Sequence, residues 1–331
     1  FPDSELEKLQ THETDYFKLF QTLPTFSANI TAHCLVRARP VTAIIHQRML
    51  SLLMNVRRKN GLEYEMGKRQ LAMKRNNSMS WFHRVNSIAN IYGLPNSYTV
   101  FEESPWNKVS WGNIIKKAIN DHIQTLWAQE LKKSSLIAIN PGSIAIGSPH
   151  PVWETARYSI HATKQAISKV RFLTDTMMNG EKRSKMFGTK ATCLCGFTIE
   201  ERFHQLLDCE IYTDLREFCL QSMIDLLTSR YPSVITEGMV RGRNAMAHLI
   251  LDPSWFRKDI GSKGKGLPCI INKDTADQLE RMGRTFCYQV YKRRFELSSS
   301  DDDSDTSEDD DEYSLHDTTD ESSSDENEEN D

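Results

Sequence analysis

Three cysteines and one histidine lie within a 17-residue segment, in the order Cys193, Cys195, His204 and Cys209, and form the pattern C-x-C-x8-H-x4-C. Proteins hold Zn²⁺ with four thiolate or imidazole ligands at the corners of a tetrahedron, and these residues supply such a set. Gly196 directly follows the second cysteine, where it suits a sharp turn that would aim both sulfurs inward. The pattern therefore predicts a Zn²⁺ site whose role is structural, because four protein ligands leave no open coordination position.

Two observations favour the alternative that this segment binds no metal. The gap between Cys193 and Cys195 is one residue, which is shorter than the usual two. Buried free cysteines beside a core histidine are also common in proteins that bind no metal. Cys219 is the reserve thiolate if the short loop between the first two cysteines does not close around the ion.

No segment carries the pattern of a catalytic site. The sequence lacks the phosphate-binding G-x-x-x-x-G-K-[ST], the metalloprotease H-E-x-x-H and the esterase G-x-S-x-G. We therefore predict no catalytic residue, and no cofactor other than Zn²⁺. The chain is not expected to be an enzyme on its own.

Lysine and arginine occur in short clusters, several of them at the predicted ends of helices. From these clusters we predict five contacts to the phosphates of RNA or DNA: Arg57, Arg58, Lys182, Arg183 and Lys185. The alternative is that the clusters serve the helices themselves, because cations near the C-terminal end of a helix interact favourably with its dipole.

The net charge of −4 conceals two segments of opposite sign. The chain has 41 Lys and Arg and 45 Asp and Glu, and 17 of the acidic residues lie in residues 298–331, which hold no Lys or Arg. Residues 1–297 therefore combine 41 basic with 28 acidic residues, a charge of +13. Such a charge favours binding to a polyanion such as a nucleic acid, mostly through its phosphates.

The acidic tail, residues 298–331, has too few apolar residues to form a core and is predicted to be disordered. Ser300 and Ser307 precede runs of acidic residues, a context typical of sites for acidophilic kinases. The tail could bind a basic protein partner such as a histone, or fold back on the body and compete with nucleic acid. The alternative is that it only keeps the protein soluble.

Cysteine usage and apolar patterning indicate the compartment. The seven cysteines are odd in number and irregularly spaced, and no secretion signal is present, so a nuclear or cytoplasmic protein is expected rather than a secreted one. No run approaches the ~18 consecutive apolar residues of a membrane span. The first residue is Phe, and the sequence is expected to be a fragment of a longer chain.

The apolar periodicity predicts helices and no strand pairs, so the predicted fold class is all-α. Helices are expected at about residues 41–59, 81–91, 111–127, 155–178, 200–208, 211–230, 237–250 and 274–296. Ser78 and Ser110 are expected to begin two of these helices, and Gly180 to end another.

Prolines and glycines gather in residues 134–153, which are predicted to be a connector. The predicted organisation is a thumb-like helical region over residues 1–133, this connector, a helical region with the cysteine motif over residues 154–297, and the acidic tail.

Several segments, in order along the chain, resemble the region that follows the catalytic domain of metazoan non-LTR (LINE-type) retrotransposon reverse transcriptases. They are residues 24–30, 38–52, 63–74, 80–82, 133–136, 147–153 and 169–174, followed by the cysteine motif. Proteins of that family carry a zinc-knuckle-like C-x2-C-x7–8-H-x4-C at the corresponding place. The resemblance spans roughly residues 1–230.

This resemblance implies a thumb-like helical region and a zinc-knuckle-like module that helps to grip template RNA or target DNA. The full-length proteins are RNA-directed DNA polymerases, but the fingers and palm with their catalytic aspartates are absent from this sequence. The one-residue cysteine gap and the acidic tail both depart from the family pattern. The alternative is a transposon-derived chain repurposed as an interaction or regulatory protein that acts through its tail, or a non-functional relic.

Overall fold

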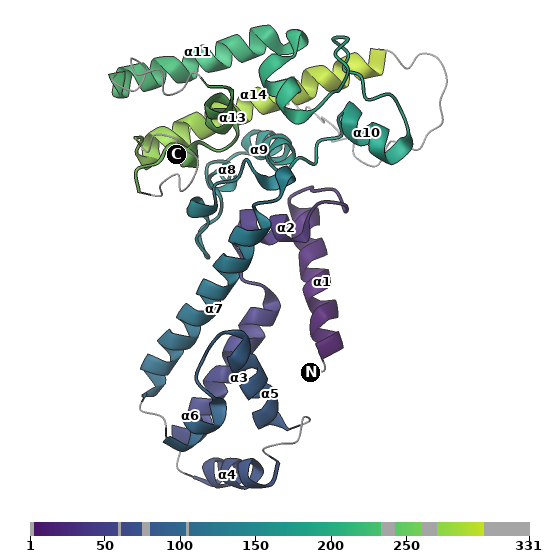
Figure 1. Ribbon diagram of the computed structural model, residues 1–331. Helices are drawn as coiled ribbons and strands as arrows, with labels where there is room; N and C mark the ends of the chain where they lie inside the picture. Colours follow the sequence, from purple (N-terminus) through teal and green to yellow (C-terminus); the bar gives the residue numbers. More distant parts are fainter. Residues whose placement is uncertain are drawn as a thin grey trace, which may run out of the picture. The chain divides into compact units, whose positions relative to one another are not determined.

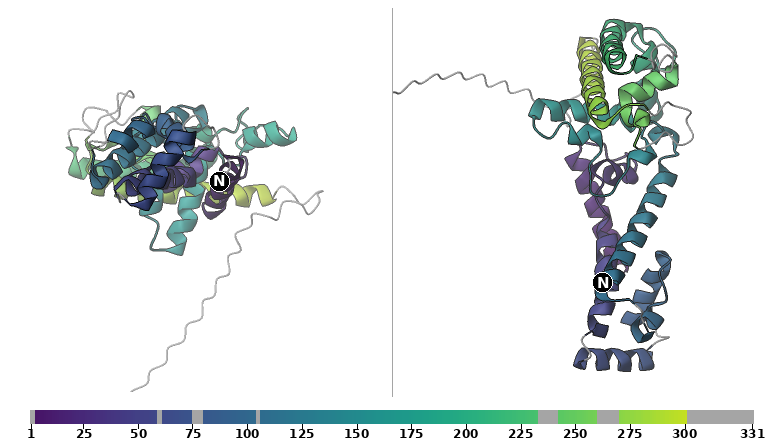
Figure 2. Two further views of the ribbon diagram at one scale, coloured as in Figure 1. Left: turned by 90° about the horizontal axis from the view of Figure 1, so that it is seen from below. Right: turned by 90° about the vertical axis from the view of Figure 1, so that its left-hand side faces the viewer.

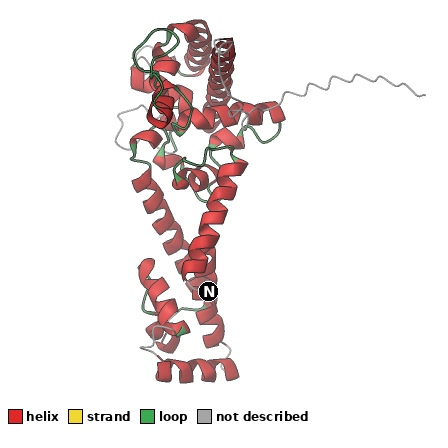
Figure 3. Ribbon diagram, turned by 90° about the vertical axis from the view of Figure 1, so that its right-hand side faces the viewer, coloured by secondary structure: helices red, strands yellow, loops and turns green. Residues whose placement is uncertain are grey.

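The described part of the chain is built from helices joined by loops and short turns (Figure 3). The computed structural model describes residues 3–58, 61–74, 80–103, 106–232, 242–259 and 270–300. Within these ranges no strand is present, and Arg257 and Ile271 form an isolated parallel bridge. The predicted all-α fold class is therefore confirmed.

The chain divides into two units, Phe1–Tyr291 and Lys292–Asp331. The cysteine motif lies in the first unit. The further division of the helical part at residues 134–153 stays a prediction. The acidic tail beyond Ser300 lies outside the described residues.

Helices form the N-terminal half, and most of them contact α3. They are α1 (Asp3–Phe20), α2 (Asn29–Val36), α3 (Val41–Arg58), α4 (Leu62–Lys74), α5 (Trp81–Ile91), α6 (Ser97–Glu103) and α7 (Lys108–Glu130). α3 contacts α1, α4, α5, α6 and α7, and it lies beside α7 (Figure 1). α4 lies across the C-terminal end of α3 (Figures 1 and 2).

The pairing of α3 with α7 follows from the apolar pattern of α7. Every fourth residue of α7 is apolar and buried, which gives the helix one continuous apolar face. These residues are Trp111, Ile115, Ile119, Ile123 and Trp127. The indole Nε1 of Trp111 donates a hydrogen bond to the carbonyl oxygen of Leu50 on α3 at 3.0 Å. The buried N–H of this tryptophan therefore has a hydrogen-bond partner.

Two of these helices begin at residues other than those predicted. Ser80 caps α5, because its Oγ accepts a hydrogen bond from the backbone N–H of His83, whereas Ser78 lies outside the described residues. α7 begins earlier than predicted, because the side chain of Asn107 accepts from the N–H of Ser110 at 2.9 Å. Asparagine and serine are both good N-caps, and Asn107 and Ser110 lie only three residues apart in the sequence.

Helices also form the C-terminal half. They are α8 (Pro151–Glu154), α9 (Ile160–Leu173), α10 (Gly180–Phe187), α11 (Thr213–Arg230), α13 (Arg243–Leu251) and α14 (Lys273–Ser300). Three short helical turns accompany them: η3 (His204–Asp208), η4 (Glu210–Tyr212) and η5 (Pro253–Phe256). The helix predicted over residues 155–178 is thus shorter, and that over residues 200–208 is reduced largely to the turn η3.

Gly180 begins α10 instead of ending α9, which corrects the prediction. The side chain of Asn179 accepts a hydrogen bond from the N–H of Lys182 at 2.9 Å and so caps the start of α10. α9 already ends at Leu173. A glycine after an asparagine cap is compatible with a helix start, and the sequence alone did not separate the two roles.

The predicted connector is tied to the rest of the first unit by buried hydrogen bonds. The fully buried carboxylate of Asp252 accepts from the N–H of Asn140 at 2.7 Å and from the N–H of Ser254 at 3.1 Å. The indole of Trp255 donates to the carbonyl of Ala138 at 2.8 Å. Backbone groups of a proline-rich segment need such partners when they are buried, and residues 252–255 supply them.

α14 approaches α9 and α13 closely. Lys169 on α9 and Glu280 on α14 form a fully buried ion pair with 2.8 Å between Nζ and Oε1. A Cβ atom at Gly283 would lie 2.2 Å from the carbonyl oxygen of Ile250 on α13, so only glycine allows this approach.

No helix in the described ranges is both long and apolar enough to cross a membrane.

Candidate metal centre

The structure brings the four predicted ligand residues together. One ligand atom from each of Cys193, Cys195, His204 and Cys209 lies within 4.8 Å of every other, and three of the four residues are buried. The Sγ atoms of Cys193 and Cys209 are 3.7 Å apart, and Sγ of Cys195 is 3.3 Å from Nε2 of His204. This cluster could hold a metal ion.

These distances match a tetrahedral site with sulfur and nitrogen ligands. Zn–S bonds of about 2.3 Å at tetrahedral angles place two sulfurs about 3.8 Å apart, and a Zn–N bond of about 2.0 Å places sulfur and nitrogen about 3.5 Å apart. Both pairs above are close to these values. In these two pairs the ligand atoms of the three cysteines and the histidine are therefore spaced as a tetrahedral ion requires.

A tight turn presents the first two cysteines. The N–H of Cys193 donates to the carbonyl of Phe197, and the N–H of Gly196 donates to the carbonyl of Cys193, both at 2.9 Å. Gly196 has a φ of +88°, a conformation that residues with a Cβ atom rarely adopt. The one-residue spacing is therefore compatible with two inward-facing sulfurs, because the glycine closes the turn.

A π turn presents the second pair of ligands. η3 is a π-helical turn over His204–Asp208, closed by a 2.8 Å hydrogen bond from the N–H of Cys209 to the carbonyl of His204. In an α-helix of 3.6 residues per turn, residues five apart point roughly 140° away from each other. In the wider π turn, residues five apart lie one full turn apart and on the same side. The spacing of His204 and Cys209 therefore suits two neighbouring ligands.

Burial favours the neutral forms of Cys193, His204 and Cys209. It raises the pKa of Cys193 to about 12 and also raises the pKa of Cys209. Burial lowers the pKa of His204, which favours the neutral imidazole that metals bind. A cation that enters must therefore displace the thiol protons, since the thiolate is the ligand.

Glu200 holds the cysteine loop against the start of α10. Its buried carboxylate accepts hydrogen bonds from the N–H of Gly180 and, at 2.8 Å, from the side-chain amide of Gln205. Its backbone N–H donates to the carbonyl of Ala191 at 2.8 Å. A carboxylate at a helix N-terminus also interacts favourably with the helix dipole.

Arg202 anchors the segment that carries His204. Its buried guanidinium donates through Nη1 to the carbonyls of Ser135, Phe172 and Leu173 at 3.1–3.3 Å. Phe172 and Leu173 are the last residues of α9, and the carbonyls at the C-terminal end of a helix attract a cation. The sequence analysis did not single out Glu200 or Arg202, although charged residues between the candidate ligands were a signal.

Among the described residues, the other thiols take no part in the cluster. Cys219, the predicted reserve ligand, is buried on α11, and its Sγ lies 3.9 Å from the carbonyl oxygen of Met282 on α14. Cys34 and Cys287 are also buried and free. Burial raises the pKa of Cys219 to about 12.

Three of the residues predicted to contact phosphates, Arg57, Lys182 and Lys185, have partners within the protein. Arg57 donates through Nε to the carbonyl of Phe101 at 2.9 Å, and the side chain of Arg58 lies outside the described residues. On α10, Lys182 pairs with Asp175 and Lys185 pairs with Glu181. Arg183, next to Lys182, is half-buried. Arg57 thus lies on α3, whereas Lys182, Arg183 and Lys185 lie together on α10, and their contacts to phosphates stay a prediction.

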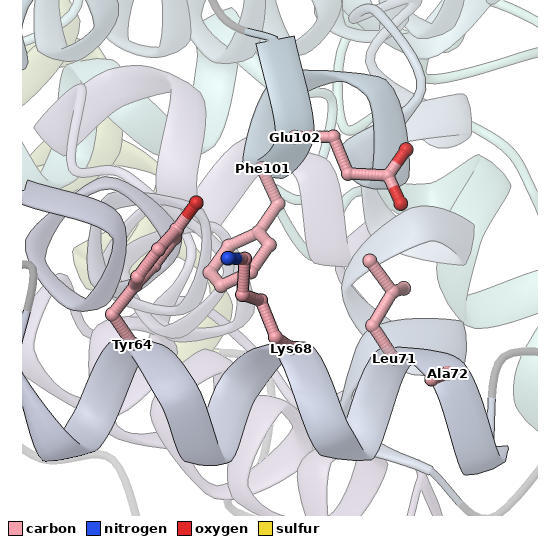
Figure 4. A pocket seen from close by; sticks show the side chains of 6 residues that line it. All are labelled: Tyr64, Lys68, Leu71, Ala72, Phe101 and Glu102. Carbon is pink, nitrogen blue, oxygen red and sulfur yellow. The ribbon is translucent and has the colours of Figure 1, made fainter.

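A shallow pocket lies between α4 and α6 (Figure 4). Its volume is about 310 Å³, and it is lined by Tyr64, Lys68, Leu71, Ala72, Phe101 and Glu102. Nζ of Lys68 lies 4.8 Å from the centre of the Tyr64 ring, a cation–π contact. These residues do not form a pair of nucleophile and base, so the pocket offers no evident catalytic chemistry.

No family model, curated protein or solved structure matches this chain.

Proposed function

We propose that Cys193, Cys195, His204 and Cys209 bind a structural Zn²⁺ ion. The observation that carries this proposal is the convergence of four sulfur and nitrogen atoms within 4.8 Å of one another. Three thiolates and one imidazole are the ligand set that zinc prefers, and with four protein ligands no position remains for a substrate. The ion would fix the turn of the first two cysteines to the π turn of the second pair.

We further propose that this chain is a nucleic-acid-binding module without polymerase activity of its own. The charge of +13 over residues 1–297 supports this proposal, because a basic body attracts phosphates and releases counterions when it binds them. The resemblance to the region after the catalytic domain of non-LTR retrotransposon reverse transcriptases supports the same function. Binding would be mostly independent of base sequence, since phosphate contacts carry no sequence information.

The zinc proposal is tested with Cys209→Ser. We expect less than one Zn²⁺ per chain by elemental analysis, together with a lower melting temperature, because metal binding to a folded site contributes to the free energy of folding. Cys219→Ser is the matched control, since this thiol is also buried but lies outside the cluster. Full zinc content in Cys209→Ser, or equal zinc loss in both variants, would contradict the assignment.

The nucleic-acid proposal is tested by fluorescence anisotropy with a structured RNA over a series of salt concentrations. If the protein neutralises several phosphates, we expect the affinity to fall steeply, on the order of 10³-fold between about 50 and 200 mM salt. An affinity that stays flat over this range, or no binding at low salt, would rule out the mechanism.

A further inference from the structure

The helix α4 has one face packed against the body and one face open to solvent. On the packed face Leu71 is buried, and the ring of Tyr64 lies 5.5 Å from the ring of Phe101 on α6 (Figure 4). Gly67 lies on the same face, where a Cβ atom would come within 2.8 Å of the Phe101 ring. These contacts fix which side of α4 faces outward.

The outer face of α4 carries an apolar stripe. Leu62 is 74% exposed, Met66 is 54% exposed and Met73 is 72% exposed. Arg69, which is also exposed, completes a series whose members follow one another after four, three and four residues. Residues at this spacing lie on one side of a helix and form the contact seam of a two-stranded coiled coil. The outer face of α4 therefore has the pattern of a helix that pairs with another helix.

The composition of α4 favours neither a nucleic acid nor the acidic tail as the partner of this face. From Leu62 to Met73 the helix has two acidic residues, both in its first half, and two basic residues, both in its second half. A segment without net charge does not attract a polyanion. Residues 298–331 contain only two apolar side chains, which are too few to cover an apolar stripe.

We propose that α4 binds α4 of a second copy of this chain, antiparallel to it and about a two-fold axis that passes between Met66 and Arg69. In this register Leu62 lies opposite Met73 of the second copy. Met66 lies opposite Arg69 of the second copy, so every residue of the stripe has a partner. α4 lies at the outer edge of the N-terminal helices, where a second copy can approach it (Figures 1 and 2).

The order of charges along α4 makes this face complementary to itself, as a two-fold interface requires. The acidic first half of one helix faces the basic second half of the other, and Glu65 of each copy comes next to Arg69 of the other copy. Within its own chain Glu65 has only a loose ion pair, with 3.7 Å between its Oε1 and Nζ of Lys68. The aliphatic stem of Arg69 would cover Met66 of the second copy while its guanidinium pairs with Glu65.

The test follows the molar mass of the full chain by sedimentation velocity over concentrations from about 1 µM to 1 mM. The interface is small, so we expect the wild type to change from monomer to dimer within this range. Leu62→Glu should weaken dimerisation by about tenfold or more, because it places a charge in the seam twice in every dimer. A wild type that stays monomeric at all concentrations overturns the proposal.

Ile160→Glu is the matched control for Leu62→Glu. Ile160 is 82% exposed and is the first residue of α9, just as Leu62 is the first residue of α4. The control should dimerise like the wild type. Equal weakening by both substitutions would show that the association does not depend on α4, and would overturn the proposal.

A mixing experiment tests the pairing of charges. Glu65→Arg brings arginines together across the axis and Arg69→Glu brings glutamates together, so each variant alone should dimerise more weakly, on the order of tenfold. An equimolar mixture of the two variants should dimerise about as strongly as the wild type, because both ion pairs re-form between unlike chains. A mixture that associates no better than either variant alone overturns this pairing. The proposal does not rest on the zinc site or on nucleic-acid binding, so its failure would leave both unaffected.

Discussion

His33 and Cys193 show at the scale of single residues how burial sets ionisation in this protein. Burial lowers the pKa of His33 to about 4 and raises that of Cys193 to about 12. Both shifts favour the neutral form, because a buried charge loses its hydration. For Cys193 a metal ion would reverse the effect. For His33, whose Nδ1 has no hydrogen-bond partner in the described structure, the result is a dependence of stability on pH.

We expect the free energy of unfolding to fall as the pH drops from about 6.5 towards 4. The unfolded chain takes up a proton at His33 near its ordinary pKa, whereas the folded protein resists it, so the unfolded state gains relative stability in this window. The contribution of His33 is at most about 3 kcal/mol. Urea denaturation at several pH values measures it.

His33→Gln serves as the reference in this experiment. Glutamine can still interact with Thr14 and Gln10, which contact Nε2 of His33, but it does not titrate. The variant should therefore show a shallower dependence on pH than the wild type between 4 and 6.5. Identical slopes for the two proteins would show that His33 is not responsible.

Two local elements form the candidate metal centre, and each is defined by a backbone hydrogen bond over a few residues. The turn at Cys193–Phe197 aims two sulfurs inward, and the π turn from His204 to Cys209 places the other two ligands one turn apart. At this scale the one-residue gap between Cys193 and Cys195 has a physical explanation. Gly196 closes the shorter turn because it accepts a positive φ.

Packing between elements depends on a single glycine in α14. In Gly283→Ala the new methyl group would lie 2.2 Å from the carbonyl oxygen of Ile250 and 3.0 Å from Nζ of Lys169, so α13 or α14 must move. We expect the free energy of unfolding to fall by about 3 kcal/mol or more, because the new methyl group clashes with a buried backbone carbonyl that cannot rotate away. Urea denaturation measures the change.

Gly112→Ala on α7 is the matched control for this substitution. A Cβ atom there meets no other atom within 4 Å, and alanine is a better helix former than glycine. The control should therefore stabilise the protein by up to about 1 kcal/mol. Equal effects of the two substitutions would contradict the close approach of α13 and α14.

The charge of the whole molecule is divided between a basic body and an acidic tail. Truncation after Ser300 removes all 17 acidic residues of the tail and changes the net charge from −4 to +13. We expect the truncated protein to bind RNA more tightly, on the order of tenfold at low salt, because the long-range attraction for phosphates is no longer opposed. Anisotropy with the same structured RNA measures the change.

A second variant separates charge from chain length. In this variant every Asp and Glu of the tail is replaced by Asn and Gln, so that the length stays and the charge disappears. It should bind RNA as tightly as the truncated protein, and high salt should remove the difference from the wild type. If only the truncated protein gains affinity, the tail acts by bulk and not by charge.

The sequence by itself determined the helical class and the identity of the four candidate ligands. Both depend on short-range patterns: the buried face of α7 repeats every four residues, and the ligand pairs lie within two local turns. A short-range pattern predicts local structure, because residues that are near one another in the sequence share one helix face or one turn, independently of the rest of the chain. The first residues of α5, α7 and α10 were predicted less accurately, because several residues that can cap a helix lie close together in the sequence.

Only the tertiary structure decided how the two pairs of candidate ligands come together and which charged side chains form hydrogen bonds with distant segments. Arg202 joins the His204 segment to carbonyls of Ser135 and α9, and Glu200 joins the cysteine loop to α10. Arg57 likewise donates through Nε to the carbonyl of Phe101, 44 residues away, while its contact to phosphate stays a prediction. These contacts depend on the packing of distant segments, and a one-dimensional pattern carries no record of which buried donors and acceptors meet.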